Sequence, residues 1–152
     1  MKGREIRQLV DGATYLFTNE YESALTEQKT GWTAAQILER VDVRVTTLGS
    51  KGAMVEQQGE PPVVVHCPPE ERIADPTGVG DAFRAGYLAA VAWGLPADRC
   101  CQVGSALATY VIETVGTQEY ELSRRHLLDR LARTYGDDAA ADVEPHVRCP
   151  RP

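Results

Sequence analysis

The sequence predicts an α/β protein in which strands and helices form a layered sheet. Short runs rich in β-branched residues are followed by helical stretches, and glycine-containing loops of the kind that hold phosphate lie between them. The 152 residues suffice for one domain, which can bury about two-thirds of the surface that the unfolded chain exposes. We expect that domain to cover residues 1–147, followed by a loose tail at 148–152.

Composition and charge exclude several functions. A net charge of −6 argues against a nucleic-acid backbone as the main partner, because that contact depends on Lys and Arg neutralising phosphates. The longest apolar stretch, Ala82–Trp93, is interrupted by Arg84 and is too short to span a bilayer. The start resembles no secretory signal, and the four cysteines lack zinc-type spacing. We therefore expect a cytoplasmic protein without a membrane or nucleic-acid partner.

The first half of the chain alternates between the two element types. Gly12 and Gly31 are suited to end helices, because glycine adopts the left-handed conformation at a helix C-terminus. The predicted elements are a helix at 4–11, a strand at 15–18, helices at 20–27 and 33–40, and strands at 43–47, 53–57 and 63–67.

The second half is predicted to be helical. Residues 78–93 are apolar almost all round, so this helix should be buried on most sides, and Gly94 ends it. Adjacent Cys100 and Cys101 are expected to pack inside the next helix. The predicted helices run from 78 to 93, 97 to 113, 123 to 135 and 138 to 147.

The segment Asp75–Phe83 carries the chemistry. Gly78 and Gly80 lie just before the long helix, whose first N–H groups have no partners within the helix. Together with the positive end of the helix dipole, these groups make an anion hole. Asp81 places a carboxylate beside it, so one short segment offers charge stabilisation and a proton acceptor for phosphoryl transfer. Without its context, a bare GxGD is more often a glycine-rich helix start with a capping aspartate.

The same segment closely resembles the DTxGAGDxF signature of the ribokinase family, the PfkB carbohydrate kinases. The resemblance implies that Asp81 is the base acting on the substrate hydroxyl. It also implies that Gly78, Val79 and Gly80 form the anion hole for the transferred phosphoryl group. Val79 replaces the usual small residue but keeps its N–H, so we expect the hole to survive.

Two further motifs follow the family's order along the chain. Asn19-x-x-Glu22 resembles the NxxE element, in which the Asn lies near the ATP phosphates and the Glu organises magnesium through water. Residues 46–52 resemble the TLGxxG loop that packs against ATP, and they lie at a strand's C-terminal end, where open α/β sheets bind ligands. The ATP-binding residues implied are Asn19, Thr47, Leu48, Gly49, Lys51 and Gly52.

Other segments extend the resemblance. Residues 15–19, 29–32, 83–86 and 116–119 look like the bacterial adenosine kinases of the family, which implies ATP-dependent phosphorylation of the 5′-hydroxyl of adenosine or of a related sugar hydroxyl. Many relatives bind a monovalent cation such as K⁺, for which Asp75, Thr77 and Thr114–Thr117 are candidates. Asp75 is equally suited to cap a turn before Pro76. Gly104 and Ser105 allow either a base or a neighbouring helix to approach.

The resemblance implies a layered α/β/α ribokinase-like fold of which this chain supplies only the C-terminal portion. A family kinase is about twice this length, and its N-terminal half and β-sheet lid, which hold most of the acceptor, are absent from the sequence. We expect such a chain to act with a second copy of itself or with the missing N-terminal half. Two functions remain open: an ATP-dependent kinase, and a nucleotide-binding remnant or interaction module without turnover of its own.

Overall fold

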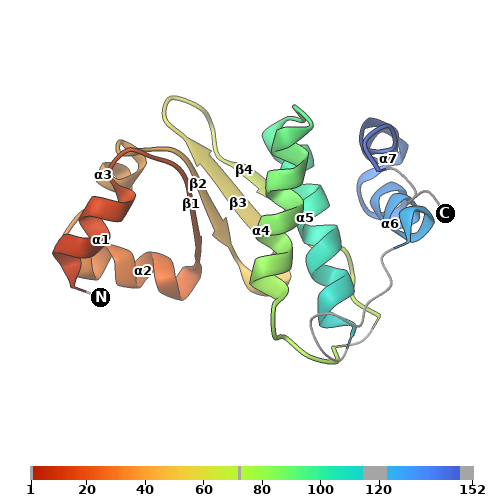
Figure 1. The fold of residues 1–152 in the computed structure, drawn as a ribbon, viewed down its shortest axis with the longest axis horizontal. Helices are drawn as coiled ribbons and strands as arrows, with labels where there is room; N and C mark the ends of the chain where they lie inside the picture. The colour runs from red at the N-terminus through yellow and green to blue at the C-terminus, as the bar shows by residue number, and fades with distance from the viewer. Residues whose placement is uncertain (1, 72, 115–122, 148–152) are drawn as a thin grey trace. The chain divides into compact units, whose positions relative to one another are not determined.

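The computed structural model describes residues 2–71, 73–114 and 123–147 (Figure 1). The chain groups into two compact units, Met1–Val64 and Val65–Pro152, which we describe separately. The single domain over 1–147 stays a prediction. The tail expected at 148–152 and the segment 116–119 lie outside the described residues.

The first unit is built around a mixed sheet with the strand order β1-β2-β3-β4 (Figure 1). β1 and β2 are parallel and are connected through helices, whereas β2 and β3 are antiparallel. Its elements are α1 (Gly3–Val10), β1 (Ala13–Asn19), α2 (Glu20–Thr30), α3 (Ala34–Leu38), β2 (Val41–Thr47), the 3₁₀ turn η1 (Gly49–Lys51), β3 (Ala53–Gln57) and β4 (Val63–Val65), which reaches the boundary between the units.

The strand predicted at 63–67 is two residues too long. β4 ends at Val65, because Pro68 and Pro69 follow closely and have no N–H to donate to a ladder. The His66 carbonyl oxygen instead accepts a hydrogen bond from the Tyr135 hydroxyl at 2.6 Å. The backbone therefore leaves the strand to contact a helix of the second unit, to which His66 itself belongs.

The core of the first unit lies where α1 and α3 pack near the start of the two parallel strands. Val10, Ile37 and Val41 are buried there, and Leu16 and Trp32 pack against them. The guanidinium groups of Arg7 and Arg40 lie over the Trp32 ring, 5.4 and 4.3 Å from its centroid. The helix predicted at 33–40 is shorter, since the chain turns after Leu38 and the Arg40 carbonyl accepts from the Gly12 N–H.

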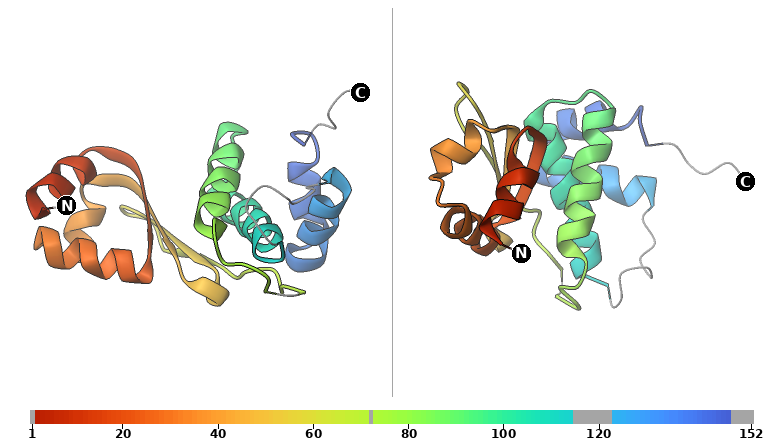
Figure 2. Two further views of the ribbon diagram at one scale, coloured as in Figure 1. Left: turned by 60° about the horizontal axis from the view of Figure 1, so that its bottom comes forward. Right: turned by 60° about the vertical axis from the view of Figure 1, so that its left-hand side comes forward.

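The second unit begins with the end of β4 and a loop, and its helices are α4 (Val79–Ala92), α5 (Ala97–Ile112), α6 (Arg124–Tyr135) and α7 (Asp137–Val143), packed in chain order (Figure 2). The prediction that the first of these helices is buried on most sides is wrong. α4 buries one face, with Phe83, Tyr87 and Ala90, and leaves Asp81 and Leu88 exposed. None of the described helices is both long and apolar enough to cross a membrane.

The closest approach in this unit joins α4 to α5. A Cβ added at Gly104 would lie 2.8 Å from the Phe83 carbonyl oxygen, and one added at Gly86 would lie 2.9 Å from the Cα of Gly104. Of the two interpretations of Gly104, close packing between helices is therefore the one observed. Cys100 and Cys101 are buried in α5, as predicted.

α7 is shorter than the helix predicted at 138–147. It begins at Asp137, directly after Gly136, whose φ of 98° only glycine adopts readily, and it ends at Val143. Arg99 on α5 donates to Asp142 at 2.8 Å, and Trp93 stacks on His146 with ring centroids 5.3 Å apart. These contacts fix the end of the described chain against α4 and α5.

Candidate active site

The glycine loop ahead of α4 has the local geometry that the sequence predicts. Gly78 is the N-cap of the helix and has a φ of 79°, in the left-handed region that favours glycine. One turn earlier, the Asp75 carboxylate accepts a hydrogen bond from the Thr77 N–H at 2.8 Å. The first helical bond runs from the Ala82 N–H to the Gly78 carbonyl oxygen at 2.9 Å. The loop is thus a short, internally braced entrance to the helix.

Several N–H groups of this loop are available to a ligand. Within the described residues, the N–H groups of Gly78, Gly80 and Asp81 have no hydrogen-bond acceptor, and the Val79 N–H has only a long contact of 3.4 Å to the Pro76 carbonyl. Unpaired N–H groups at the positive end of a helix dipole attract anions. The loop can therefore hold an oxyanion through its backbone alone.

Asp81 stands in the first turn of α4 with its side chain 82% exposed. Its Oδ1 atom lies 3.4 Å from Nη1 of Arg84, one helical turn further on. Nη2 of Arg84 also lies 3.6 Å from the position that a Gly80 Cβ would occupy, so this cation stands beside the glycine loop. The sequence interpretation missed Arg84, although its i,i+3 spacing from Asp81 could have identified the pair.

The residues predicted for a monovalent cation are partly brought together. The N–H groups of Ala74 and Asp75 donate to the Ile112 carbonyl oxygen at 2.7 and 3.2 Å, which places the start of the loop against the C-terminal end of α5. Thr114 lies at that end and donates its hydroxyl hydrogen to the Tyr110 carbonyl at 2.6 Å. Residues 115–117 lie outside the described residues. Asp75 does brace the turn at Thr77, as its structural interpretation required.

In the first unit, Asn19 and Glu22 form a reciprocal cap at the start of α2. The Glu22 N–H donates to Oδ1 of Asn19 at 2.7 Å, and the Asn19 N–H donates to Oε2 of Glu22 at 2.9 Å. Such a pair satisfies two backbone donors that the helix leaves unpaired. The NxxE motif is thus also a structural device, and its spacing is the signal that sequence reasoning could have used to find the cap.

The two ATP motifs predicted in this unit lie side by side. Asn19, the last residue of β1, is directly opposite Thr47, the last residue of β2. Beyond Thr47 the chain turns tightly: the Leu48 N–H donates to the Gly52 carbonyl at 2.8 Å, and Gly49 and Gly52 have φ angles of 60° and 108°. The carboxyl ends of parallel strands are where open α/β sheets bind ligands.

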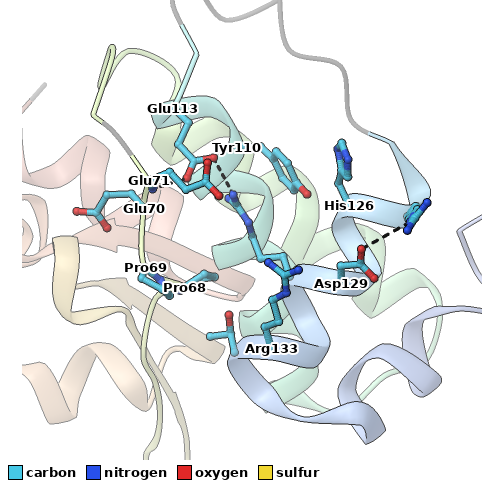
Figure 3. A pocket seen from close by; sticks show the side chains of 12 residues that line it. Pro68, Pro69, Glu70, Glu71, Tyr110, Glu113, His126, Asp129 and Arg133 are labelled. Atoms are coloured by element: carbon cyan, nitrogen blue, oxygen red, sulfur yellow. Dashed lines mark hydrogen bonds and ion pairs between the residues drawn. The ribbon is translucent and has the colours of Figure 1, made fainter.

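A hollow of about 670 Å³ opens in the second unit, and none of the described residues predicted for the site lines it (Figure 3). Arg130 is one of its lining residues and lies 2.7 Å from Glu113 and 4.1 Å from the centroid of the Tyr110 ring, and Arg125 lies 3.9 Å from Asp129. Basic and acidic side chains alternate around it, so its charge selects no class of ligand. Its walls are formed by Pro68, Pro69, Glu70, Glu71, Tyr110, Glu113, Arg125, His126, Asp129, Arg130, Arg133 and Thr134.

The buried thiols of α5 and the His66 ring have packing roles. Burial raises the pKa of the Cys100 thiol to about 11 and that of Cys101 to about 12, which keeps both protonated and unreactive near neutral pH. His66 packs against the Tyr135 ring with centroids 5.2 Å apart. Across the residues described, no three His, Cys, Asp or Glu side chains gather in a way that could hold a metal ion.

The fold and the glycine loop define a class: an α/β protein with a glycine N-cap and, among the described residues, unpaired N–H groups at the start of α4. The chain belongs to the pfkB family of carbohydrate kinases, whose family model matches residues 2–124. Among curated proteins it is similar to a nucleoside kinase of Methanocaldococcus jannaschii, with 32% identity covering 73% of this chain and 36% of that protein. It is also similar to a cytidine kinase of Thermococcus kodakarensis, with 34% identity covering 73% of this chain and 41% of that protein.

Solved structures show that the fold is ribokinase-like. The nucleoside kinase of Burkholderia thailandensis in complex with inosine superposes with a TM-score of 0.85 at 31% identity, covering 90% of this chain and 45% of that one. The same kinase is also known in complex with ADP and inosine. The chain thus spans less than half the length of the relatives it matches.

Proposed function

We propose that this chain is the phosphoryl-transfer portion of an ATP-dependent kinase that phosphorylates the 5′-hydroxyl of a nucleoside. The observation that carries the proposal is the glycine loop of α4, where the N–H groups of Gly80 and Asp81 lack acceptors among the described residues and an exposed carboxylate stands beside them. Phosphoryl transfer needs charge stabilisation on the moving group and a base for the attacking hydroxyl, and this loop offers both.

In this proposal Asp81 accepts the proton of the acceptor hydroxyl, while Gly78, Val79 and Gly80 hold the transferred phosphoryl group through their N–H groups. Arg84 lies beside the same loop and adds positive charge where negative charge develops. When a phosphate occupies the loop, Arg84 has a second anion to pair with. Asp81 then keeps its exposed carboxylate available to the incoming hydroxyl.

For the nucleotide we propose the second pair of motifs. Asn19 and the loop formed by Thr47, Leu48, Gly49, Lys51 and Gly52 would contact ATP, which fits their shared position at the carboxyl ends of two parallel strands. Glu22 is exposed and uses one carboxylate oxygen in its own helix cap, which fits contact with Mg²⁺ through water. When bound, Mg²⁺ would neutralise charge on the phosphates. Asp75 and Thr77 are the candidates for K⁺.

The acceptor is best described as a nucleoside. The relatives are a nucleoside kinase and a cytidine kinase, and the solved structure contains inosine, so their names do not single out adenosine. Adenosine remains our specific proposal, with a related sugar hydroxyl next. Because the chain covers less than half of its relatives, the competing proposal is a nucleotide-binding remnant that turns over only with a complementary half or a second copy.

The decisive experiment follows ADP release from Mg·ATP and K⁺ by the purified chain with adenosine, inosine, cytidine, ribose and fructose in parallel. In a chain that turns over, Asp81→Asn should lower the rate about 100- to 10,000-fold, the usual contribution of a general base. Asp98→Asn is the matched control, since Asp98 is an acidic residue in the first turn of the neighbouring helix α5.

Release that depends on a nucleoside, disappears in Asp81→Asn and survives in Asp98→Asn supports the kinase. Mg·ATP binding without release from any acceptor supports the remnant. A folded chain that binds no Mg·ATP contradicts both.

A further inference from the structure

Arg44 is a buried cation in the middle of the sheet of the first unit. It lies on β2 between its register partners Leu16 on β1 and Glu56 on β3, and only 5% of it is exposed. Arginine is rarely this buried unless it is paired, because removing a charge from water is costly. The partners of its guanidinium group therefore indicate its role.

The guanidinium group reaches two different elements. Nη2 donates to the Ser23 hydroxyl at 2.5 Å and lies 3.3 Å from Oε1 of Glu27, both on α2. Nε lies 3.8 Å from Oε2 of Glu56 on β3, too far for a hydrogen bond, and has no hydrogen-bond partner among the described residues. One side chain thus fastens α2 to two adjacent strands.

The contact between Arg44 and α2 lies beside the Asn19–Glu22 cap. Ser23 directly follows Glu22, so the bond from Arg44 reaches the first turn of the helix that Asn19 and Glu22 cap. On its own strand, Arg44 stands three positions before Thr47, where the Thr47–Gly52 loop begins and where Asn19 is the register partner.

We propose that Arg44 is a positioning residue for the nucleotide: it fixes the Asn19–Glu22 turn against the strand that leads into the Thr47–Gly52 loop. This inference rests on the proposed function, which assigns both segments to Mg·ATP. Arg44 itself touches neither the nucleotide nor the reacting atoms in this proposal. It acts by keeping the first turn of α2 in one orientation over the sheet.

A role in stability alone makes a different prediction. Replacing a buried ion pair by an apolar side chain of similar volume is often neutral or stabilising, so buried charges are weak evidence for stability. If Arg44 served only the fold, Arg44→Met should change nucleotide affinity no more than stability requires. If it positions the turn, affinity should fall even in variants that remain fully folded.

The test measures the Kd of Mg·ATP for the whole chain by calorimetry, together with urea unfolding of each variant. Arg44→Met should weaken Mg·ATP about tenfold, within the range of up to about 100-fold that a small misplacement of positioning groups produces. Arg44→Lys keeps the charge but not the planar fork, and should restore affinity only in part. Arg40→Met is the matched control, because Arg40 packs on Trp32 in the same unit and makes no hydrogen bond or ion pair with α2 among the described residues.

A second measurement separates positioning from general loosening. If Arg44 acts through the capped turn, Asn19→Ala and Arg44→Met should not be additive, and the double variant should bind about as weakly as the weaker single variant. Hydrogen exchange supplies a readout without nucleotide: the amides of Asn19 and Glu22, which the cap holds, should exchange faster in Arg44→Met while those of β2 remain protected. Where Arg44→Met fails to fold, Ser23→Ala replaces it, since it removes only one acceptor.

The outcomes distinguish the positioning role of Arg44 from the proposed function itself. Loss of affinity with non-additivity and faster exchange in α2 supports the inference. Unchanged affinity in a folded Arg44→Met or Ser23→Ala, or equal losses in Arg40→Met, overturns it while leaving the proposed function standing. A folded, unaltered chain that does not bind Mg·ATP overturns the proposed function, and with it the nucleotide role of Arg44.

Discussion

Two helix starts in this molecule, the capped turn of α2 and the glycine loop of α4, differ in how their polar groups are satisfied. At α2, Asn19 and Glu22 satisfy each other's backbone, so the motif is complete without a ligand. At α4, the N–H groups of Gly80 and Asp81 have no acceptor among the described residues. Within the same residues, the Asp81 carboxylate pairs with Arg84. The α2 start is thus closed by its own side chains, whereas the α4 start leaves N–H groups open to solvent or to a ligand.

The two helix starts meet the same requirement, hydrogen-bond acceptors for the first N–H groups, in different ways. Every helix leaves its first N–H groups without intrahelical partners. In α2 a side chain fills that need, which stabilises the turn and leaves one carboxylate oxygen of Glu22 for other contacts. In α4 a glycine, Gly78, stands at the N-cap, and no side chain in the described part of the chain accepts from the first N–H groups. Under the proposed function an anion takes that place, so Gly80 tests function, whereas Asn19 already has a structural role.

Among the substitutions that test this comparison, the largest effect is expected from Gly80→Ala at the start of α4. The added Cβ would meet only Nη2 of Arg84 at 3.6 Å, an ordinary contact, so the free energy of unfolding should stay within about 0.5 kcal/mol of the unaltered chain. The methyl group would stand where an oxyanion approaches. The rate of ADP release should fall by about 100-fold, comparable to the loss of one oxyanion-hole donor.

Where the chain alone does not turn over, the Kd of Mg·ATP serves as the readout for Gly80→Ala. Equal Mg·ATP affinity and equal rate in a folded variant would show that the unpaired N–H groups have no ligand, and the contrast with α2 would lose its functional meaning.

A smaller effect is expected from Gly104→Ala, which disturbs the packing behind the loop. The new Cβ would lie 2.8 Å from the Phe83 carbonyl oxygen and 3.1 Å from the Phe83 ring, so α4 and α5 must separate. Overpacking of this kind costs about 1–3 kcal/mol, offset in part because alanine favours helix by about 1 kcal/mol over glycine. Urea unfolding measures the loss, and Gly80→Ala is the matched control because there the same substitution has room.

Gly104→Ala should also leave the exchange of amides in α2 unchanged, because the packing it disturbs lies within the second unit. A variant as stable as the unaltered chain would contradict the close approach of the two helices.

The smallest effect is expected at the capped start of α2, where two substitutions of Glu22 distinguish its role in the helix cap from its proposed role at Mg²⁺. Glutamine can still close the cap, so Glu22→Gln should retain stability, whereas Glu22→Ala should lose about 0.5–1 kcal/mol. If Glu22 also organises Mg²⁺, both variants should need about tenfold more Mg²⁺ for half-maximal Mg·ATP binding. A magnesium titration alongside urea unfolding reads both quantities.

Should Glu22→Gln match the unaltered chain in stability and in magnesium dependence, Glu22 is a capping residue only. In that case the contrast between the two helix starts becomes complete.

Much of the secondary structure followed from local pattern. Gly12, Gly31 and Gly94 each follow a helix and have a positive φ, as expected, although α2 runs to Thr30, beyond the helix predicted at 20–27. The strand at 63–67 and the helix at 33–40 were each drawn too long. Pro68 and Pro69 already limited the strand, but the contacts that take over beyond each element are non-local: a Tyr135 hydroxyl on the His66 carbonyl, and a Gly12 N–H on the Arg40 carbonyl. Burial on one face of α4 was missed because an almost uniformly apolar sequence does not show which face has a neighbour.

The candidate site divides in the same way. The sequence alone indicated the family, which the family model confirms, because the signature depends on residue types at fixed spacing within one short segment. The roles of Asp81 and of the glycine loop stay predictions from that same segment. Only the tertiary structure decided that Asn19 lies opposite Thr47, that Phe83 packs closely on Gly104, and that the Arg44 guanidinium donates to the Ser23 hydroxyl on α2. Those contacts join residues far apart in the chain, and their energy depends on distance and burial, which no periodicity of the sequence records.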